Sequence, residues 1–265
     1  MNNGALSHPL QPLLAVDRLT KTYGEIVACD RISLTLYPGQ VLGIIGESGS
    51  GKTTLLNAIA GNLPIDSGQM QYGSRSGDRL ELTTLPEPQR RQLMRTEWGF
   101  VQQNPRDGLR LNVTAGANIG ERLMEVGARH YGNIRSEAAQ WLTQVEIPPA
   151  RMDGLPSNFS GGMQQRLQLA RVLVTQPRLV LMDEPTGGLD VSVQAKLLDL
   201  MRSLVRTLDL SVILVTHDIG VVRLLADRLL VMQGGQVVES GLTDQVLDDP
   251  QHPYTQQLVS ATLVP

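Results

Sequence analysis

The sequence is poor in the residues that mark several classes of protein. Cys29 is the only cysteine among 265 residues, so one chain can build neither a disulfide nor a cysteine metal cluster, as is typical of a reducing compartment. Aromatic residues make up 3% and the net charge is -3, which excludes a basic field or many stacking platforms for nucleic acid. No apolar run approaches a membrane span, and residues 1–11 lack the pattern of a signal peptide. We therefore expect a cytoplasmic protein with no nucleic-acid partner and no direct membrane insertion.

A chain of 265 residues is long enough to bury a full hydrophobic core, and no linker-like stretch divides it. From Arg178 to Met232, strand and helix patterns alternate as they do in parallel sheets. Between Val113 and about Pro177 the periodicity is helical, which predicts a helical insertion within an α/β sheet domain. The segment from Ser74 to Glu81 is polar and contains glycine, so we expect a loop there. The tail from Asp244 predicts one short helix and then a second.

The stretch from Val41 to Leu56 predicts a strand, a loop and a helix. An apolar run ends at Gly46, four residues follow, and Gly51-Lys52-Thr53 opens an amphipathic segment, which is the pattern of a phosphate-binding loop. Glycines let successive N–H groups turn inward around phosphates, and the helix adds its positive dipole end. A flexible Gly/Ser-rich turn could match by accident, but the flanking strand and helix favour the phosphate loop. The nucleotide-binding residues that the motif indicates are Gly46, Glu47, Ser48, Gly49, Ser50, Gly51, Lys52, Thr53 and Thr54.

Short polar stretches lie where other strands end or helices begin. Asp183-Glu184 and His217 each follow an apolar strand pattern, and Ser160 is placed as the N-cap of a helix. Taken alone, an acidic pair is as typical of a solvated loop or a helix cap as of a functional site. A lone histidine more often has a structural role than a functional one. Tyr23, just before Gly24, could simply cap a hairpin.

Together and in this order, the phosphate loop, Ser160-Gly161-Gly162, Asp183-Glu184 and Thr216-His217-Asp218 resemble an ATP-binding cassette (ABC) ATPase. The resemblance covers nearly the whole chain, and the Ser-Gly-Gly signature separates this family from kinases and other phosphate-loop enzymes. It implies an α/β fold of the ABC-type P-loop NTPases: a RecA-like mixed sheet core with an antiparallel β subdomain and a helical signature subdomain.

The resemblance also implies a single domain over residues 1–265. Its core would span about 10–105 and 177–243, the helical subdomain about 106–176, and a C-terminal helical tail 244–265. Two chains would form a homodimer that encloses two ATP molecules. Each ATP would lie between the phosphate loop of one subunit and the signature of the other.

The family assigns binding roles to several residues. Tyr23 matches the aromatic residue that stacks on adenine. Ser160, Gly161 and Gly162 match the signature that reaches the γ-phosphate across the dimer. Asp190 matches the residue that couples the two sites, although Gly187-Gly188 replaces a more common small-residue pair and is expected to loosen this loop.

The family also assigns the roles in hydrolysis. Thr53, Gln103 and Asp183 match the residues around Mg²⁺, and Gln103 also senses the attacking water. Glu184 matches the residue that polarises this water, and His217 the one that contacts the γ-phosphate. The resemblance therefore implies a Mg²⁺-dependent ATPase with ATP as its ligand.

Two groups of cassette proteins share further motifs with this chain. The ATPase subunits of peptide and nickel importers, which sit on a membrane permease, resemble it at residues 183–186, 189–194, 216–222 and 252–255. The cassette protein of the bacterial carbon–phosphorus lyase system, which breaks down phosphonates, is closely similar at residues 95–99, 107–110, 116–123 and 127–132.

The second set lies after Gln103, in the region that faces the partner in cassette proteins. We therefore favour an ATPase that docks on the soluble lyase core subunits, supports phosphonate catabolism and transports nothing. As a hypothesis, the stretch from Arg106 to Arg129 forms the docking surface, with Arg110 and Arg122 among its charges; a solvated face is the alternative. A third interpretation is an assembly factor whose nucleotide only clamps the dimer, but Glu184 and His217 argue against an inactive ATPase.

Overall fold

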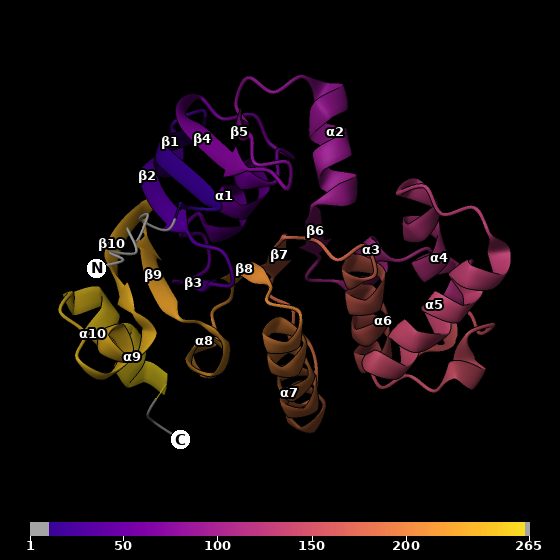
Figure 1. The fold of residues 1–265 in the computed structure, drawn as a ribbon. Helices are drawn as coiled ribbons and strands as arrows, with labels where there is room; N and C mark the ends of the chain where they lie inside the picture. The colour runs from indigo at the N-terminus through magenta and orange to yellow at the C-terminus, as the bar shows by residue number, and fades with distance from the viewer. Residues whose placement is uncertain (1–10, 263–265) are drawn as a thin grey trace, which may run out of the picture.

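The structure, a computed structural model, describes residues 11–262. The expectations for residues 1–10 and for the last three residues of the tail lie outside this range. Two sheets and a group of helices make up the described chain (Figure 1). An antiparallel sheet has the order β2-β1-β4-β5 and contains β1 (Leu14–Tyr23), β2 (Ile26–Leu36), β4 (Ser67–Gly73) and β5 (Arg79–Glu81).

The second sheet has six strands in the order β10-β9-β3-β8-β7-β6. These are β3 (Val41–Ile45), β6 (Trp98–Val101), β7 (Leu179–Asp183), β8 (Ser211–Val215), β9 (Arg228–Gln233) and β10 (Gln236–Leu242). The first five of these strands pair in parallel, and β10 pairs antiparallel with β9 through a tight turn at 234–235. The alternating strands and helices expected in the second half of the chain are thus confirmed.

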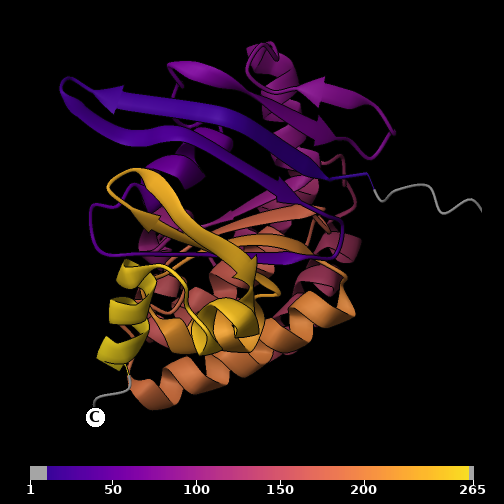
Figure 2. The ribbon, with the colours of Figure 1, turned by 90° about the vertical axis from the view of Figure 1, so that its left-hand side faces the viewer.

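The six-stranded sheet is covered on both faces. Every residue of β3, β7 and β8 is buried, as expected for central parallel strands. Alternate residues belong to two cores: in β3, Leu42 and Ile44 pack toward the antiparallel sheet and α1 (Lys52–Ile59), whereas Val41 and Ile45 pack toward the helices on the other side. Figure 2 shows the antiparallel sheet above, the six-stranded sheet in the middle and α7 (Val191–Thr207) below.

Helices occupy most of the chain between β6 and β7, as expected from the change in periodicity. They are α3 (Pro105–Gly108), α4 (Ala115–Glu125), α5 (Tyr131–Gln144) and α6 (Gly161–Leu173), and they extend to the right in Figure 1. Two short 3-10 helices, Pro149–Arg151 and Pro156–Asn158, lie between α5 and α6. The remaining α-helices are α2 (Glu87–Thr96), α8 (Ile219–Leu225), α9 (Thr243–Asp248) and α10 (Pro253–Thr262). Both helices expected in the tail are therefore present, while the expected subdomain boundaries stay predictions.

The loop expected from Ser74 to Glu81 is wrong in its last three residues. Arg79–Glu81 forms β5, which pairs with β4 from Gln71 to Gly73. This strand lies at the edge of its sheet, is short and has a charged residue on each side of Leu80, as edge strands commonly do. Composition alone therefore indicated a loop, because the pairing partner that makes this segment a strand cannot be seen locally.

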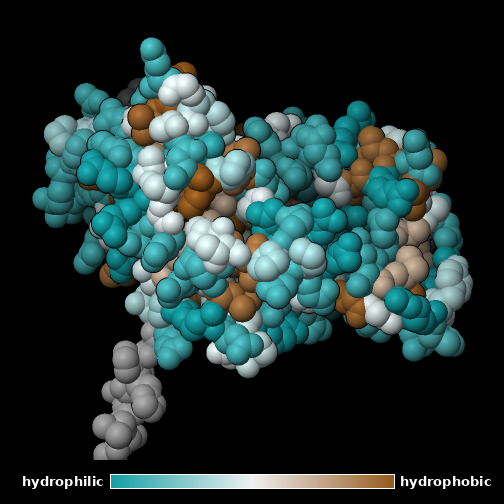
Figure 3. Space-filling view, turned by 90° about the horizontal axis from the view of Figure 1, so that it is seen from above, coloured by the Kyte–Doolittle hydropathy of each residue, from teal (hydrophilic) through white to brown (hydrophobic). Residues whose placement is uncertain are grey.

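Among residues 11–262, no helix combines the length and the apolar character needed to cross a membrane. Seen from above, the hydrophobic residues form small groups on a largely hydrophilic surface (Figure 3).

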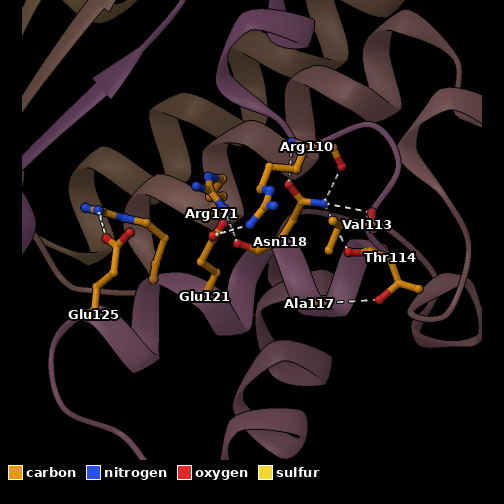
Figure 4. Close-up of polar contacts among 9 residues, drawn as sticks. Arg110, Val113, Thr114, Ala117, Asn118, Glu121, Glu125 and Arg171 are labelled. Carbon is orange, nitrogen blue, oxygen red and sulfur yellow. Dashed lines mark hydrogen bonds and ion pairs between the residues drawn. The ribbon is translucent and has the colours of Figure 1, made fainter.

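Asn118 of α4 fixes the loop between α3 and α4 (Figure 4). Its side chain is fully buried at 0% exposure. Its Oδ1 accepts a hydrogen bond of 2.8 Å from the Arg110 N–H, and its Nδ2 donates to the carbonyls of Arg110, Val113 and Thr114 at 2.9–3.1 Å. One side chain thus contacts four backbone groups of the loop. The carbonyls of Arg110 and Thr114 also accept backbone hydrogen bonds, from the Val113 and Asn118 N–H groups.

We expect Asn118→Ala to lower the free energy of unfolding by about 2–3 kcal/mol, because buried backbone groups lose their partners. The control is Asn133→Ala in α5, where the residue is exposed and the change should stay within about 0.5 kcal/mol. Urea unfolding followed by circular dichroism gives both values. Equal stabilities of the two variants would contradict the role of Asn118.

Candidate functional site

The loop between β3 and α1 depends on glycine at two positions. Gly46 has a φ of 153°, and a Cβ there would lie 2.1 Å from the Met232 carbonyl oxygen. Gly51 has a φ of 100° and precedes α1, and its Cβ would lie 2.0 Å from the Ala28 carbonyl oxygen. Any side chain would therefore push the loop away from β9 or β2, so the glycines keep it in the close turn that a phosphate loop requires.

Lys52 closes this loop from inside. Its Nζ donates to the carbonyls of Gly46 and Glu47 at 2.8 and 2.7 Å, and to the Ser50 hydroxyl at 3.3 Å. Burial lowers the pKa of Lys52, against the attraction of nearby carboxylates, which acts to raise it. An ammonium held by neutral carbonyls in a buried place is stabilised further by an anion, so the loop is suited to phosphate.

Asp183 ends β7 beside the loop. It is 7% exposed, and its Oδ1 accepts a hydrogen bond of 3.2 Å from the Thr53 hydroxyl. Burial raises the pKa of this carboxyl, although the hydrogen bond from Thr53 opposes the rise. A buried carboxylate next to a hydroxyl offers hard oxygen ligands and gains from a nearby cation, so these residues fit Mg²⁺.

Glu184 follows in a conformation that is uncommon for a residue other than glycine, with a φ of 44°. Its backbone N–H donates to the carbonyl of Val215 in β8 at 2.8 Å. Its side chain is 13% exposed, whereas that of His217 is 71% exposed, and the two meet with 2.7 Å between Glu184 Oε1 and His217 Nδ1. The Thr216 hydroxyl donates to Glu184 Oε2 at 3.3 Å. This strained backbone and these hydrogen bonds hold the carboxylate in one place, as is common at functional sites.

A cavity of about 600 Å³ joins these groups, a volume typical of ligand sites. It is lined by Tyr23, Ile26, Ala28, Ser48, Gly49, Gly51, Lys52, Thr53, Thr54, Gln103, Glu184 and His217. Residues from five separated parts of the sequence thus meet at one cavity, and their individual roles stay predictions. Asp183 lies just behind the lining, in contact with Thr53.

Tyr23 is the last residue of β1, lines this cavity and is 47% exposed. The Lys21 Nζ lies 5.4 Å from the centre of its ring. Asp66 accepts hydrogen bonds from that Nζ at 3.1 Å and from the Thr22 N–H and hydroxyl at 2.6 and 2.7 Å. These bonds hold the end of β1, so the ring is presented to the cavity by a fixed backbone.

Ser160, Gly161, Gly162 and Asp190 do not line this cavity. Ser160 is the N-cap of α6 and accepts a hydrogen bond of 3.3 Å from the Met163 N–H, as predicted. Asp190 precedes α7, and its side chain caps no N–H group there. In the neighbouring turn the Gly187 N–H donates to the Glu184 carbonyl at 2.9 Å, so this turn is hydrogen-bonded directly to the residue beside the cavity.

Three features of the site were not predicted. Ile26 and Ala28 of β2 line the cavity, and the Thr216 hydroxyl contacts Glu184. The Tyr254 hydroxyl accepts a hydrogen bond from the phosphate loop. The motif at 252–255 contains Tyr254, but in the sequence it indicates only a similarity to importer ATPases. For β2, nothing in the sequence indicates which residues of the hairpin face the loop.

The profile of the ABC transporter family matches residues 29–187, and that of an AAA domain, described as putative AbiEii toxin of a Type IV TA system, matches residues 155–223. The putative phosphonates utilization ATP-binding protein PhnK of Escherichia coli is 64% identical over 96% of this chain and 98% of its own. The oligopeptide transport ATP-binding protein OppD of Bacillus subtilis is 38% identical over 91% of this chain and 68% of its own.

Solved structures support the same relationship. The dimeric ATP-binding cassette MJ0796 in a post-hydrolysis state, bound to ADP and Pi, is 30% identical with a TM-score of 0.77 over 87% of this chain and 98% of its own. The cbiO1 protein of Clostridium perfringens, part of the ABC transporter complex cbiONQ, is 25% identical with a TM-score of 0.77 over 95% of this chain and 96% of its own. The expected fold class is thereby confirmed.

We expect Tyr23→Ala to weaken ATP binding about tenfold, because stacking of a base on an aromatic ring contributes roughly 1–3 kcal/mol. Binding of inorganic triphosphate, which has no base, should not change. Titration calorimetry measures both affinities, with Tyr37→Ala at the end of the same hairpin as the control. An equal loss for ATP and inorganic triphosphate would show that Tyr23 supports the loop and does not contact the base.

Proposed function

The chain belongs to the ABC transporter family of ATP-binding proteins, and from this premise we propose that it is a Mg²⁺-dependent ATPase of phosphonate catabolism. It works in the cytoplasm as a homodimer docked on the core subunits of the carbon–phosphorus lyase complex. The observation that carries this proposal is the 64% identity to the phosphonate-utilisation relative over nearly the full length of both chains. The peptide-transport relatives are less similar, at 37–38% identity.

The geometry of the cavity supports ATP hydrolysis. Phosphoryl transfer to water asks a protein mainly for positioning and for stabilisation of charge. Lys52 supplies a buried positive charge in the phosphate loop, and Glu184 supplies a carboxylate whose direction is fixed by Thr216 and His217. We infer that Glu184 orients the attacking water and that His217 faces the γ-phosphate. Mg²⁺, held by Thr53, Gln103 and Asp183, would neutralise phosphate charge.

The position of the signature supports a dimer. Ser160 and Gly162 lie at the start of α6, outside the cavity formed by their own chain. The start of a helix with exposed N–H groups favours an anion, so in this proposal the signature of a second copy completes the site. The similar cassette bound to ADP and Pi is itself dimeric.

The proposed docking surface from Arg106 to Arg129 carries less free charge than its composition indicates. Arg110 pairs with Glu121 at 2.7 Å (Figure 4), and Arg122 pairs with Glu125. The opposite charges within each pair partly cancel, so recognition of a partner by charge alone is weakened. The cavity of about 420 Å³ between α2, α4 and α6 lies beside this stretch and offers shape as well as charge.

We expect Glu184→Gln to retain ATP binding and to lower the rate of ATP hydrolysis by a factor of about 100 or more, as for a lost general base. The dimer should then accumulate with ATP, which size-exclusion chromatography detects. The control is Glu25→Gln, in the exposed turn between β1 and β2. Normal turnover in the Glu184 variant would refute its role, whereas a wild-type protein that binds ATP without turnover would favour the assembly-factor interpretation.

A pull-down of the tagged protein from its own cells, without detergent, should recover the soluble subunits of a carbon–phosphorus lyase, identified by mass spectrometry. A parallel pull-down from detergent-solubilised membranes tests the alternative, a nucleotide-binding subunit of a peptide or nickel importer. Recovery of an integral-membrane permease in the second experiment, with no lyase subunit in the first, would reject the lyase assignment.

A further inference from the structure

The C-terminal segment reaches back to the phosphate loop. Tyr254, at the start of α10, places its hydroxyl 2.7 Å from the backbone nitrogen of Glu47, whose N–H donates to it. The ring is partly buried against the core that α6, α7 and α8 share with the sheet. A residue 207 positions away in the sequence thus makes a direct hydrogen bond to the loop.

The segment that carries Tyr254 is itself held in place. Glu239 of β10 accepts hydrogen bonds from the N–H groups of Gln251 and His252 at 2.9 and 3.0 Å. The His252 Nδ1 in turn accepts from the Tyr254 N–H at 3.2 Å, and Thr255 is fully buried. Burial acts to raise the pKa of Glu239, but these backbone hydrogen bonds hold it below its usual value. The ring of Tyr254 therefore approaches the loop from a fixed base on β10.

The hydrogen bond acts on one particular peptide group. The N–H of Glu47 and the carbonyl of Gly46 belong to the same planar unit. Its N–H points to Tyr254, and its carbonyl accepts the hydrogen bond from Lys52 Nζ at 2.8 Å. Because the unit is rigid, fixing its N–H also fixes the direction of its carbonyl. Nearby, the Gly235 N–H donates to the Ser50 carbonyl at 3.1 Å, so the outer side of the loop has two supports from the C-terminal part of the chain.

We propose that Tyr254 is a positioning residue of the nucleotide site. Its hydroxyl sets the orientation of the Gly46–Glu47 peptide, and through it the place of the Lys52 ammonium, before a nucleotide binds. A loop that is already ordered loses less conformational entropy on binding, so the affinity for phosphate groups rises. The role rests on nucleotide binding at this loop, as proposed above. Since ADP and ATP both place phosphates there, both should be affected alike, and binding rather than the chemical step should change.

The test is Tyr254→Phe, which removes one oxygen and keeps the ring. The dissociation constants for ATP and for ADP should each rise about three- to tenfold, as for the loss of one hydrogen bond to a loop N–H. The value of kcat at saturating ATP should stay within about twofold. The control is Tyr37→Phe, in the loop after β2, whose hydroxyl makes no hydrogen bond within residues 11–262. Titration calorimetry and steady-state kinetics supply these numbers.

A second variant, Glu239→Gln, weakens the base of the segment and keeps Tyr254 intact. It should shift both dissociation constants in the same direction by a smaller factor. If Tyr254→Phe lowers only the melting temperature and leaves both dissociation constants at the wild-type values, the hydroxyl is merely structural and the proposal is wrong. A fall in kcat without a change in affinity overturns it as well. If the wild-type protein binds neither ADP nor ATP, the proposed function is wrong, and this inference is wrong with it.

Discussion

The site depends on the register of three buried parallel strands. Val215 of β8 pairs with Ile44 of β3 on one side and with Asp183 of β7 on the other. The carboxyl ends of these strands therefore meet at one edge of the sheet, which is where ligands bind in open α/β folds. The phosphate loop follows β3, the acidic pair begins at the last residue of β7, and His217 lies two residues after β8. A slip of one residue in β7 would exchange the faces of Met182 and Asp183, so burial of the sheet on both sides fixes the chemistry as well as the fold.

The same edge holds several groups in states that cost free energy in the absence of a ligand. Lys52 is desolvated among neutral carbonyls, Asp183 is a buried carboxyl with a raised pKa, and Glu184 has a positive φ. The rest of the core offsets these costs. Under the proposed function, a phosphate group would relieve the cost at Lys52, and a divalent cation would relieve the cost at Asp183. Under the proposed function, these two charges together favour a nucleotide with its bound metal over either one alone.

Local patterns were sufficient where sequence neighbours are also neighbours in space. The phosphate loop, the cap at Ser160 and the acidic pair at the end of β7 are each formed by residues that are close together in the sequence. The spacing of these residues was therefore enough to predict each feature. Partners that are distant in sequence were not predictable in this way. The segment β5 is a strand only because β4 pairs with it. Glycine is required at position 46 because the Met232 carbonyl oxygen of β9 would lie 2.1 Å from a Cβ there. Tyr254 contacts Glu47 from the other end of the chain.

Gln103 lines the cavity, and its neighbour Gln102 is hydrogen-bonded to α6. The side chain of Gln168 in α6 is buried, accepts a hydrogen bond from the Gln102 N–H at 2.8 Å and donates to the Gln102 carbonyl at 3.1 Å. Farther along, Asn118 binds the backbone of the loop that follows α3. The helix that begins with the signature therefore also fixes the residue next to Gln103. Under the proposed function, a partner that moves these helices shifts Gln103 in the site of its own chain and Ser160 in the site across the dimer together, because α6 connects the two.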